Sequence, residues 1–425
     1  MKLKNFTLLN IFILIIYWSI TYVWNLVPFD IIDLSFLIII GYFAFTLVMY
    51  PIKIKKTLSM EIICLIAFIV FAIAHFVNAV FTIKQSVFES FLTVREILYI
   101  SVAFVFAFRF KYKKNNIRFI VKLEVIGCLL YFVTFALGNP ISPVANFGAS
   151  SVLVGAVNIY RDFCPVPLLI LFVCPYIALG IANKNYLWNK RKDLSTLLLL
   201  IATLGMHLFR TRLMLVLLEL IIIGFISIDE KKRRNLIKSL LKAGGILLIV
   251  LLIAMCIPTI RNRFVEGFSD ILYVVSGGEL NPYEGTFTYR MWLFNYRIQY
   301  LQEHHKLLFG LGAITSRSTL TLFGNAQIPN ELRIIYNPDN AYMTMLPRYG
   351  IVGVVFYVAL LGILSFRCYK EKTQLSVATA LYIVCAIFEG MSSNSALCEY
   401  ALLIIGMLVG MCMSEKNNKE KNKIR

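Results

Sequence analysis

The sequence has 425 residues, of which 59% are hydrophobic and 15% are charged, with a mean hydropathy of +0.76 and a formal net charge of +19. A soluble domain carries about a quarter charged residues, so this composition excludes an ordinary soluble protein. Apolar runs of about 20 residues, each long enough to cross the hydrocarbon core, predict a polytopic all-α membrane protein. The basic excess is expected on cytoplasmic loops and does not require nucleic acid as a partner.

The apolar runs predict about twelve transmembrane helices in a single integral membrane domain, residues 1–425. The first run is too long for a cleavable signal peptide and lacks a small-residue cleavage site, so we expect it to remain as a span. The predicted spans are 6–26, 30–50, 59–82, 89–108, 117–138, 164–182, 193–209, 212–228, 243–259, 341–365, 375–393 and 397–413.

Every second connector between these spans is basic, which predicts that these connectors and both termini are cytoplasmic. The basic connectors are 53–56, 109–118, 184–192, 231–242, 367–372 and 416–425. Lysine predominates on this side, whereas arginine predominates among the external basic residues. A guanidinium binds phosphate or carboxylate through two parallel hydrogen bonds, so we expect several external arginines to bind an anionic group. The alternative is ordinary ion pairing.

Residues 260–340 form a large external loop between the ninth and tenth predicted spans, and this long stretch is too polar to lie in lipid. Its middle, 286–303, predicts a helix with Arg290 and Arg297 on one face. An aromatic stripe runs beside these arginines and consists of Trp292, Tyr296 and Tyr300. The pattern is typical of a partly buried amphipathic helix on the outer membrane surface.

The end of this loop carries a helix-start signal, an Asn-Pro pair at 337–338. The signal places Asp339 and Asn340 in the first turn of the tenth span. A second external loop, 139–163, is rich in Gly, Pro and Ser and carries Arg161 near its end.

Two arginines, Arg210 and Arg212, stand in the short external turn between the seventh and eighth spans. A tight turn needs only one polar residue. A clamp on a lipid-linked diphosphate is the functional interpretation, and snorkelling to outer headgroups is the structural alternative. Ionisable residues in or beside spans are costly and are functional candidates as well. They are Arg95, Glu96, Glu219, Arg348, Glu389 and Glu399. The alternative for Arg95 and Glu96 is a pair that neutralises itself.

Three segments stand out in order along the chain: the Arg210 and Arg212 hairpin, residues 288–292 (TYRMW) with 305–312 (HKLLFGLG), and residues 339–342 (DNAY) with 349–353 (YGIVG). Together they resemble the O-antigen polymerase/ligase superfamily (Wzy- and WaaL-type enzymes), in the order and topology of that family. Asp339 stands where the family commonly has His, and His305 where it often has Pro. Because that His is treated as essential in ligases, the departure favours a polymerase over a ligase.

The resemblance implies a GT-C-like glycosyltransferase that acts on the outer face of the bacterial cytoplasmic membrane. It would transfer a glycan with inversion from undecaprenyl diphosphate to a hydroxyl of another lipid-linked repeat unit, building O-antigen or capsule. Its partners would be these lipid-linked oligosaccharides, membrane lipid, and a chain-length regulator and flippase of the same pathway. The sequence has no D-x-D motif and no C-x-x-C pair, so we expect no metal and no other cofactor.

This chemistry assigns roles to the candidate residues. Charge growing on the departing diphosphate needs preorganised donors, and the attacking hydroxyl benefits from a general base, for which His304 or His305 is the alternative to Asp339. The predicted catalytic residues are Asp339, Arg210, Arg212 and Arg290. The predicted substrate-binding residues are Arg161, Tyr289, Trp292, Arg297, His304, His305, Asn340 and Tyr342. The aromatic members are equally typical of a membrane-interface belt.

The main rival is a transporter or a flippase for lipid-linked oligosaccharides. Such proteins are often built of two related halves with a midplane site between them. The sequence shows no similarity between its halves, and its functional candidates gather at the predicted outer surface. A receptor or a structural membrane protein is the third alternative.

Overall fold

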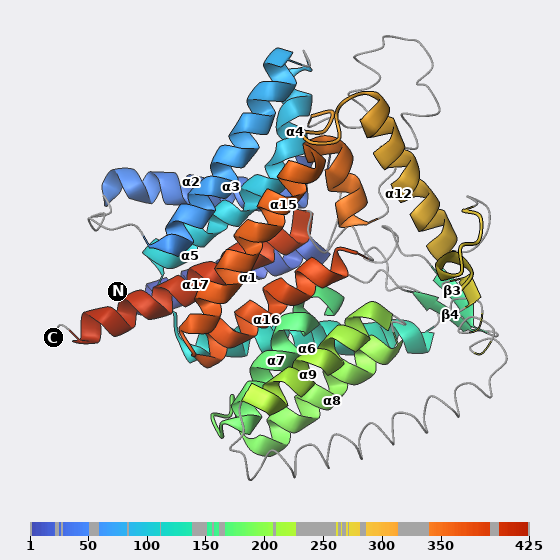
Figure 1. Cartoon of the computed structure of the whole chain (residues 1–425). Helices are drawn as coiled ribbons and strands as arrows, with labels where there is room; N and C mark the ends of the chain where they lie inside the picture. Colours follow the sequence, from blue (N-terminus) through green and yellow to red (C-terminus); the bar gives the residue numbers. More distant parts are fainter. Residues whose placement is uncertain are drawn as a thin grey trace.

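The protein, described by a computed structural model, is built almost wholly of helices (Figure 1). The structure describes residues 2–21, 25–26, 29–50, 59–82, 85–110, 112–137, 151–154, 157–160, 166–206, 210–226, 261, 265, 269–270, 272–280, 286–312, 340–391 and 399–423.

Each predicted span other than 243–259, which lies outside the described residues, overlaps a helix, but 6–26 extends past the helix that ends at Thr21 into the short strand Asn25–Leu26. The helices are α1 Lys2–Thr21, α2 Ile31–Met49, α3 Met60–Val77, α4 Val87–Leu98, α5 Val102–Arg109, α6 Lys114–Leu137, α7 Val166–Ala182, α8 Lys190–Met206, α9 Arg210–Ile226, α12 Thr286–Glu303, α15 Ala341–Lys370, α16 Gln374–Glu389 and α17 Glu399–Lys423. A π-helical turn, Asn78–Thr82, extends α3, and a 3-10 turn, Tyr99–Ser101, joins α4 to α5.

Within the described residues, three helical stretches are long and apolar enough to cross a membrane: Met60–Phe81, Val87–Arg109 and Ala341–Lys370. Shorter apolar helices are Leu8–Tyr17, Asp33–Met49, Leu169–Ala182 and Gln374–Glu389. Exposed Leu, Ile, Val and Phe side chains are spread over these helices. A surface of this kind suits lipid as its solvent, which supports a helical membrane protein.

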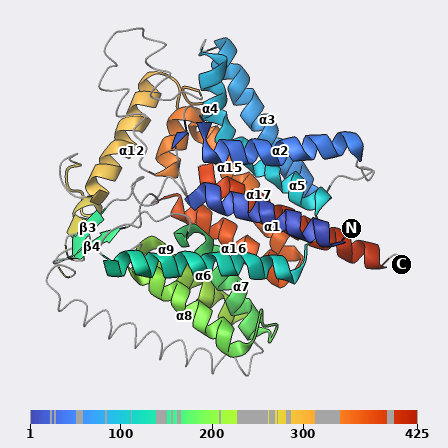
Figure 2. The ribbon, with the colours of Figure 1, turned by 180° about the vertical axis from the view of Figure 1, so that it is seen from behind.

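Helix α17 lies in the core between α5 and α16 (Figures 1 and 2). Every residue from 401 to 414 is buried. Two glycines allow the close approach to the α4–α5 segment, because a Cβ on Gly406 would lie 2.7 Å from the Ile100 carbonyl oxygen and one on Gly410 would lie 2.5 Å from that of Ala103. Small residues at helix contacts are the usual means of packing helices tightly in a membrane.

Two short antiparallel hairpins interrupt the helical pattern. Strand β1, Asn25–Leu26, pairs with β2, Phe29–Asp30, and β3, Ser151–Val154, pairs with β4, Val157–Tyr160. The second hairpin lies in the loop 139–163, whose Gly, Pro and Ser content predicted only a loop. The two short runs 151–154 and 157–160 flank a Gly-Ala pair at 155–156, a pattern typical of a hairpin. The overall Gly, Pro and Ser content of the loop did not reveal this pattern.

Four connectors predicted to be cytoplasmic meet at one end of the bundle. The Ser414 hydroxyl donates to the Phe110 carbonyl oxygen (2.6 Å), and Lys114 Nζ donates to the Tyr186 carbonyl oxygen (2.6 Å). Lys416 Nζ lies 2.7 Å from a carboxylate oxygen of Glu371. Burial lowers the pKa of Lys416, but hydrogen bonds and charges from Glu371 and Glu61 outweigh burial and leave this pKa raised.

Candidate functional site

Helix α15 breaks at Gly350, whose φ is 65° and ψ is −176°. In a continuous helix the Ile351 and Val352 N–H groups would donate to the carbonyls of Pro347 and Arg348, four residues earlier. The break separates these donors from these acceptors. Since buried backbone groups need partners, the break requires another segment to supply them.

The segment that supplies these partners is residues 307–312. The Ile351 N–H donates to the Leu307 carbonyl (3.0 Å), and the Val352 N–H donates to that of Leu308 (3.1 Å). In return, the Leu311 N–H donates to the Pro347 carbonyl (2.7 Å), and the Gly312 N–H donates to that of Arg348 (3.1 Å). Four main-chain hydrogen bonds therefore join two of the segments that carry the family resemblance.

Glycine is required on both sides of this junction. A Cβ on Gly350 would collide with the Leu308 carbonyl oxygen, and one on Gly310 would lie 2.6 Å from the Gly350 nitrogen. Both residues also have positive φ, 65° for Gly350 and 72° for Gly310, where a side chain is strained.

The first turn of α15 is held by its neighbours. Asn340 is the N-cap, and its side-chain oxygen accepts from the Met343 N–H (2.8 Å). The helix therefore begins at Ala341. Asn340 was predicted to lie inside the first turn, but it lies one residue before it. The Asn340 side chain satisfies one of the N–H groups that a helix start leaves without a partner, so the cap lies three residues after the Asn at 337 that the sequence indicated.

The start of α15 also joins α16. The Ala341 N–H donates to the Gly390 carbonyl (3.0 Å), and the Tyr342 hydroxyl donates to the Ile387 carbonyl (2.7 Å). Glu389, the last residue of α16, lies between these two acceptors in the chain and forms an ion pair with Arg212 of α9. Both side chains of this pair are 3% exposed. Arg212 is thus bound to the turn that holds the first residues of α15.

Helix α12 packs on α15 as well, through a buried face. Arg297 has no exposed surface and donates from its guanidinium to the Met343 carbonyl oxygen (2.5 Å). This bond attaches α12 to α15. The other end of α12 is capped by Asp270, whose carboxylate accepts from the Phe287 N–H (2.6 Å) and the Thr288 N–H (3.2 Å).

The first half of α15 is therefore the meeting point of the segments that the sequence singled out. Arg212 reaches it through Glu389, α12 reaches it through Arg297, and residues 307–312 close its break.

No family model matches the chain, and no curated protein matches its sequence.

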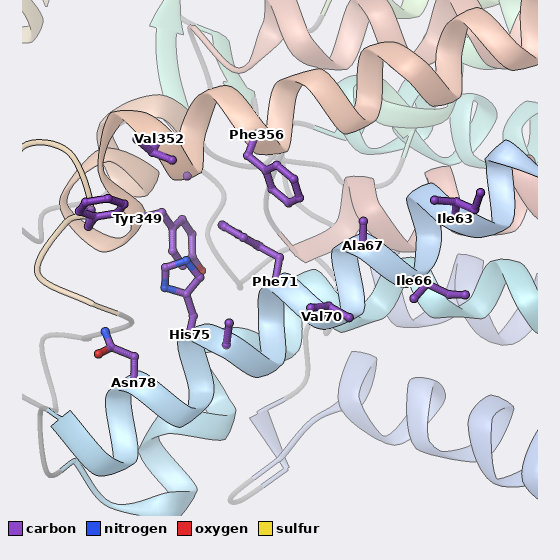
Figure 3. Close-up of a pocket in the computed structure, with 13 residues that line it drawn as sticks. Ile63, Ile66, Ala67, Val70, Phe71, His75, Asn78, Tyr349, Val352 and Phe356 are labelled. Atoms are coloured by element: carbon purple, nitrogen blue, oxygen red, sulfur yellow. The ribbon is translucent and has the colours of Figure 1, made fainter.

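An apolar groove of about 740 Å³ runs between α3 and α15 beside this junction (Figure 3). Phe309, Tyr349 and Val352 line one wall, so both joined segments contribute to it. On the α3 wall, His75 packs edge-on against Tyr349 with ring centroids 4.6 Å apart, and Asn78 stands at the same end (Figure 3). The remaining lining is apolar, with Phe71 and Phe356 among aliphatic residues, and it extends to Ile63 at the other end of α3.

The other predicted site residues are more dispersed. Arg290 is half-buried on α12, whereas His304 and His305 are exposed beyond its end. Tyr289 and Trp292 are half-buried and stack with ring centroids 6.1 Å apart. Arg210 is the first residue of α9. Asp339 and Arg161 lie outside the described residues. Among the residues that the structure describes, no group of three or more His, Cys, Asp or Glu could hold a metal ion.

Sequence reasoning missed the partners of the buried charges. Arg95 and Glu96 do not neutralise each other, because Arg95 pairs with Asp33 on α2 and Glu96 lies 3.6 Å from Arg348 on α15. Tyr99 also donates to Asp33 (2.5 Å). The only sequence feature that could have indicated a role for Asp33 is its place near the start of an apolar run.

Two carboxyl groups are buried in the helical core away from this junction. Glu124 in α6 has no exposed surface, and both its carboxylate oxygens lack a hydrogen-bond partner among the described residues. Glu219 in α9 is 1% exposed and accepts from the Cys385 thiol (3.1 Å). Carboxyl groups that are buried among helices without a cationic partner in the described residues are costly unless neutral, so they are functional candidates.

Proposed function

We propose that this protein is a membrane glycosyltransferase that polymerises undecaprenyl-diphosphate-linked oligosaccharide repeat units into a surface polysaccharide. The observation that carries the proposal is the convergence of the three resembling segments on the first half of α15. These segments are separate in the sequence, and their packing around one helix supports a common site.

The proposed reaction is an inverting displacement at the anomeric carbon of the donor. The acceptor hydroxyl oxygen forms the new bond to this carbon, and the bond from the carbon to the phosphate oxygen breaks with its electron pair leaving on undecaprenyl diphosphate. The hydroxyl proton passes to the carboxylate of Asp339, the residue before the N-cap Asn340. Arg210 and Arg290 stabilise the charge that grows on the diphosphate, and no metal is required.

Arg212 has a different part in this proposal. Its guanidinium is buried against Glu389, so it orders the end of α16 beside the site. An arginine carries five N–H donors, which allows one guanidinium to bind a carboxylate and a second anion together.

The groove between α3 and α15 suits the polyprenyl chain of the substrate. Its lining is almost wholly aliphatic and aromatic, and it runs along α3 from Asn78 to Ile63. These residues are 15 positions apart, which corresponds to about 22 Å of helix. A lipid chain lying there would carry its diphosphate at the end where Tyr349 and the α15 break stand.

The topology in this proposal has about twelve spans in a GT-C-like arrangement, with both termini in the cytoplasm of a bacterium. The connectors that meet around Lys416 and Lys114 are basic, which favours the cytoplasmic side for that end. The first turn of α15 then faces outward, where lipid-linked repeat units, a chain-length regulator and a flippase would meet the enzyme.

Deletion of the gene tests this function in the producing bacterium. A polymerase mutant would make surface glycan of one repeat unit in place of a ladder. Arg290→Ala should reproduce this loss while the protein stays in the membrane, and Arg261→Ala, which changes an exposed arginine of the same external region, should keep the ladder. Intact polymer that is not attached to its acceptor would instead identify a ligase.

A flippase for lipid-linked oligosaccharides is the second candidate, and the buried carboxyl groups of Glu124 and Glu219 favour it. Intramembrane carboxyl groups of this kind carry protons in coupled transporters. A flippase mutant would accumulate unflipped precursor on the inner leaflet. Loss of flipping in Glu219→Gln, with polymer formation restored when precursor is supplied outside, would assign the protein to this class.

A further inference from the structure

A row of aromatic rings follows one face of α12. Tyr289 stacks on Trp292 with ring centroids 6.1 Å apart and planes 29° apart, and Trp292 stacks on Tyr296 at 5.5 Å and 26°. Further along, Tyr300 stacks on His304 at 4.0 Å and 24°. These five residues, here named the aromatic ladder, are spaced three or four positions apart and extend over about 22 Å of helix.

The rings of the ladder overlap only in part. Carbon atoms in contact lie about 3.5–4.0 Å apart, so nearly parallel rings with centroids at 5.5–6.1 Å are displaced sideways like tiles. The four rings from Tyr289 to Tyr300 are half-buried, and His304 is exposed. The ladder therefore offers a long aromatic surface at the edge of the protein.

The two flanks of the ladder differ. On one side, Leu293, Arg297 and Leu301 have no exposed surface and attach α12 to the protein. On the other side, Asn295 and Gln299 are exposed, and the Gln299 amide donates to Glu303 (3.0 Å). Two amides thus border the rings, with the Glu303 carboxylate at the end of their row.

This composition distinguishes between possible occupants. A helix that lies on a membrane carries Lys and Arg on its polar face and separates its apolar and polar faces sharply. Helix α12 contains no Lys, its Arg297 is buried and its Arg290 half-buried, and its apolar and polar residues are poorly separated. The exposed combination of flat aromatic rings and amide groups suits a neutral ligand that has apolar faces and many hydroxyl groups.

We propose that the aromatic ladder binds carbohydrate, with sugar rings stacked on the aromatic rings and hydroxyl groups bonded to the amides. The inference rests on the proposed function and names the ligand as the growing glycan chain. The ladder lies beside the first half of α15, because Arg297 in the adjacent row bonds to Met343, and α12 runs along the outside of the bundle toward β3 and β4 (Figures 1 and 2).

The length of the ladder has a consequence for chain growth. About 22 Å of helix exceeds the size of one sugar ring, so several consecutive sugars contact the ladder at once. Each added ring contact lowers the dissociation constant, as in any site with several linked contacts. Longer glycans are therefore held more tightly than a single repeat unit, and the enzyme extends a bound chain before it releases it.

Fluorescence of Trp292 tests the inference in the full chain in lipid nanodiscs. The other three tryptophans, Trp18, Trp24 and Trp188, are replaced by Phe, which leaves Trp292 as the reporter. The probes are water-soluble oligosaccharides released by mild acid from the producing bacterium, of one and of four repeat units. Acrylamide should quench Trp292, and the four-repeat probe should protect it at lower concentration than the one-repeat probe.

Two outcomes of this experiment would overturn the inference. Quenching of Trp292 by brominated lipid would show that the ladder faces the membrane. Absence of protection by either oligosaccharide would show that it does not bind carbohydrate. Tyr296→Ala in the same background should weaken protection about tenfold, whereas Tyr369→Ala, at an exposed tyrosine near the far end of α15, should not change it.

The failure of this inference is distinguishable from failure of the proposed function. If wild-type protein and Tyr296→Ala both make polymer of the same length, the protein is a polymerase but the aromatic ladder has no part in chain growth. If the four-repeat probe protects Trp292 from quenching but wild-type protein joins no repeat units, the carbohydrate site is supported and the polymerase proposal is wrong.

Discussion

Arg212 in α9 and Glu389 in α16 form an ion pair in which each side chain is 3% exposed. Removing one member of a buried pair leaves the other charge without compensation and costs about 3–5 kcal/mol. We therefore expect Arg212→Met and Glu389→Leu each to lower the melting temperature strongly in detergent. The double variant replaces both charges by apolar groups and should recover most of this stability.

The double variant also separates two roles of Arg212. If its charge acts on the diphosphate, Arg212→Met/Glu389→Leu will be stable and will not polymerise. Polymerisation at the wild-type rate by a stable double variant would limit Arg212 to holding the helices together.

The junction at the α15 break predicts a strong effect of small substitutions. Gly350→Ala and Gly310→Ala each place a methyl group against main-chain atoms of the partner segment, so the four hydrogen bonds across the break cannot all form. We expect both variants to lose polymerisation and to melt at lower temperature. The matched control is Gly362→Ala in the same helix, where a Cβ meets nothing within 4 Å.

The control variant Gly362→Ala also has an expected effect on stability. Alanine is favoured over glycine inside a helix by about 0.5–1 kcal/mol, so Gly362→Ala should keep activity and be at least as stable as wild type. Normal activity in Gly350→Ala would show that the break and the 307–312 segment are not needed for function.

The cap at Asn340 predicts which substitutions are tolerated. Its side-chain oxygen accepts from the Met343 N–H, so Asn340→Ala should cost about 1 kcal/mol, measured by thermal unfolding. Asn340→Ser keeps an oxygen at the cap and should retain both stability and activity. Loss of activity in a fully stable Asn340→Ser variant would instead indicate that the amide binds substrate.

Much of the helical pattern could be predicted from the sequence, because apolar runs and helical periodicity are local signals. The predicted helix 286–303 coincides with α12, Thr286–Glu303. The break at Gly350 could not be predicted, because Pro347 and Gly350 lie in an apolar run that tolerates both residues when neighbours complete the backbone bonds. That completion is a contact between distant parts of the chain.

The candidate site was predicted in part. Sequence position indicated that Arg212 is unusual but gave no sign that Glu389 is its partner, since 177 residues separate them. Arg297 was predicted to bind substrate from its place beside Arg290, but a helix face does not reveal what covers it. Its contact with Met343 depends on how α12 packs, which is set by the whole fold.

The orientation of the bundle predicts where reporters will be active. A fluorescent protein fused after α17 should fluoresce, because the end that holds Lys416 is expected in the cytoplasm. Alkaline phosphatase inserted at the exposed Gly277, within the predicted external loop, should be active because we expect it to fold outside. Phosphatase activity at the C-terminus with none at Gly277 would invert the proposed topology.

The most direct measurement of the central claim uses purified protein and a lipid-diphosphate-linked oligosaccharide repeat unit, with chelator and without nucleotide sugar. We expect products of two, three and more repeats from wild-type protein and none from Asp339→Ala. Glu279→Ala, which removes an exposed carboxylate of the same predicted external loop, should elongate normally. No elongation by stable wild-type protein on authentic substrate would contradict the proposed polymerase.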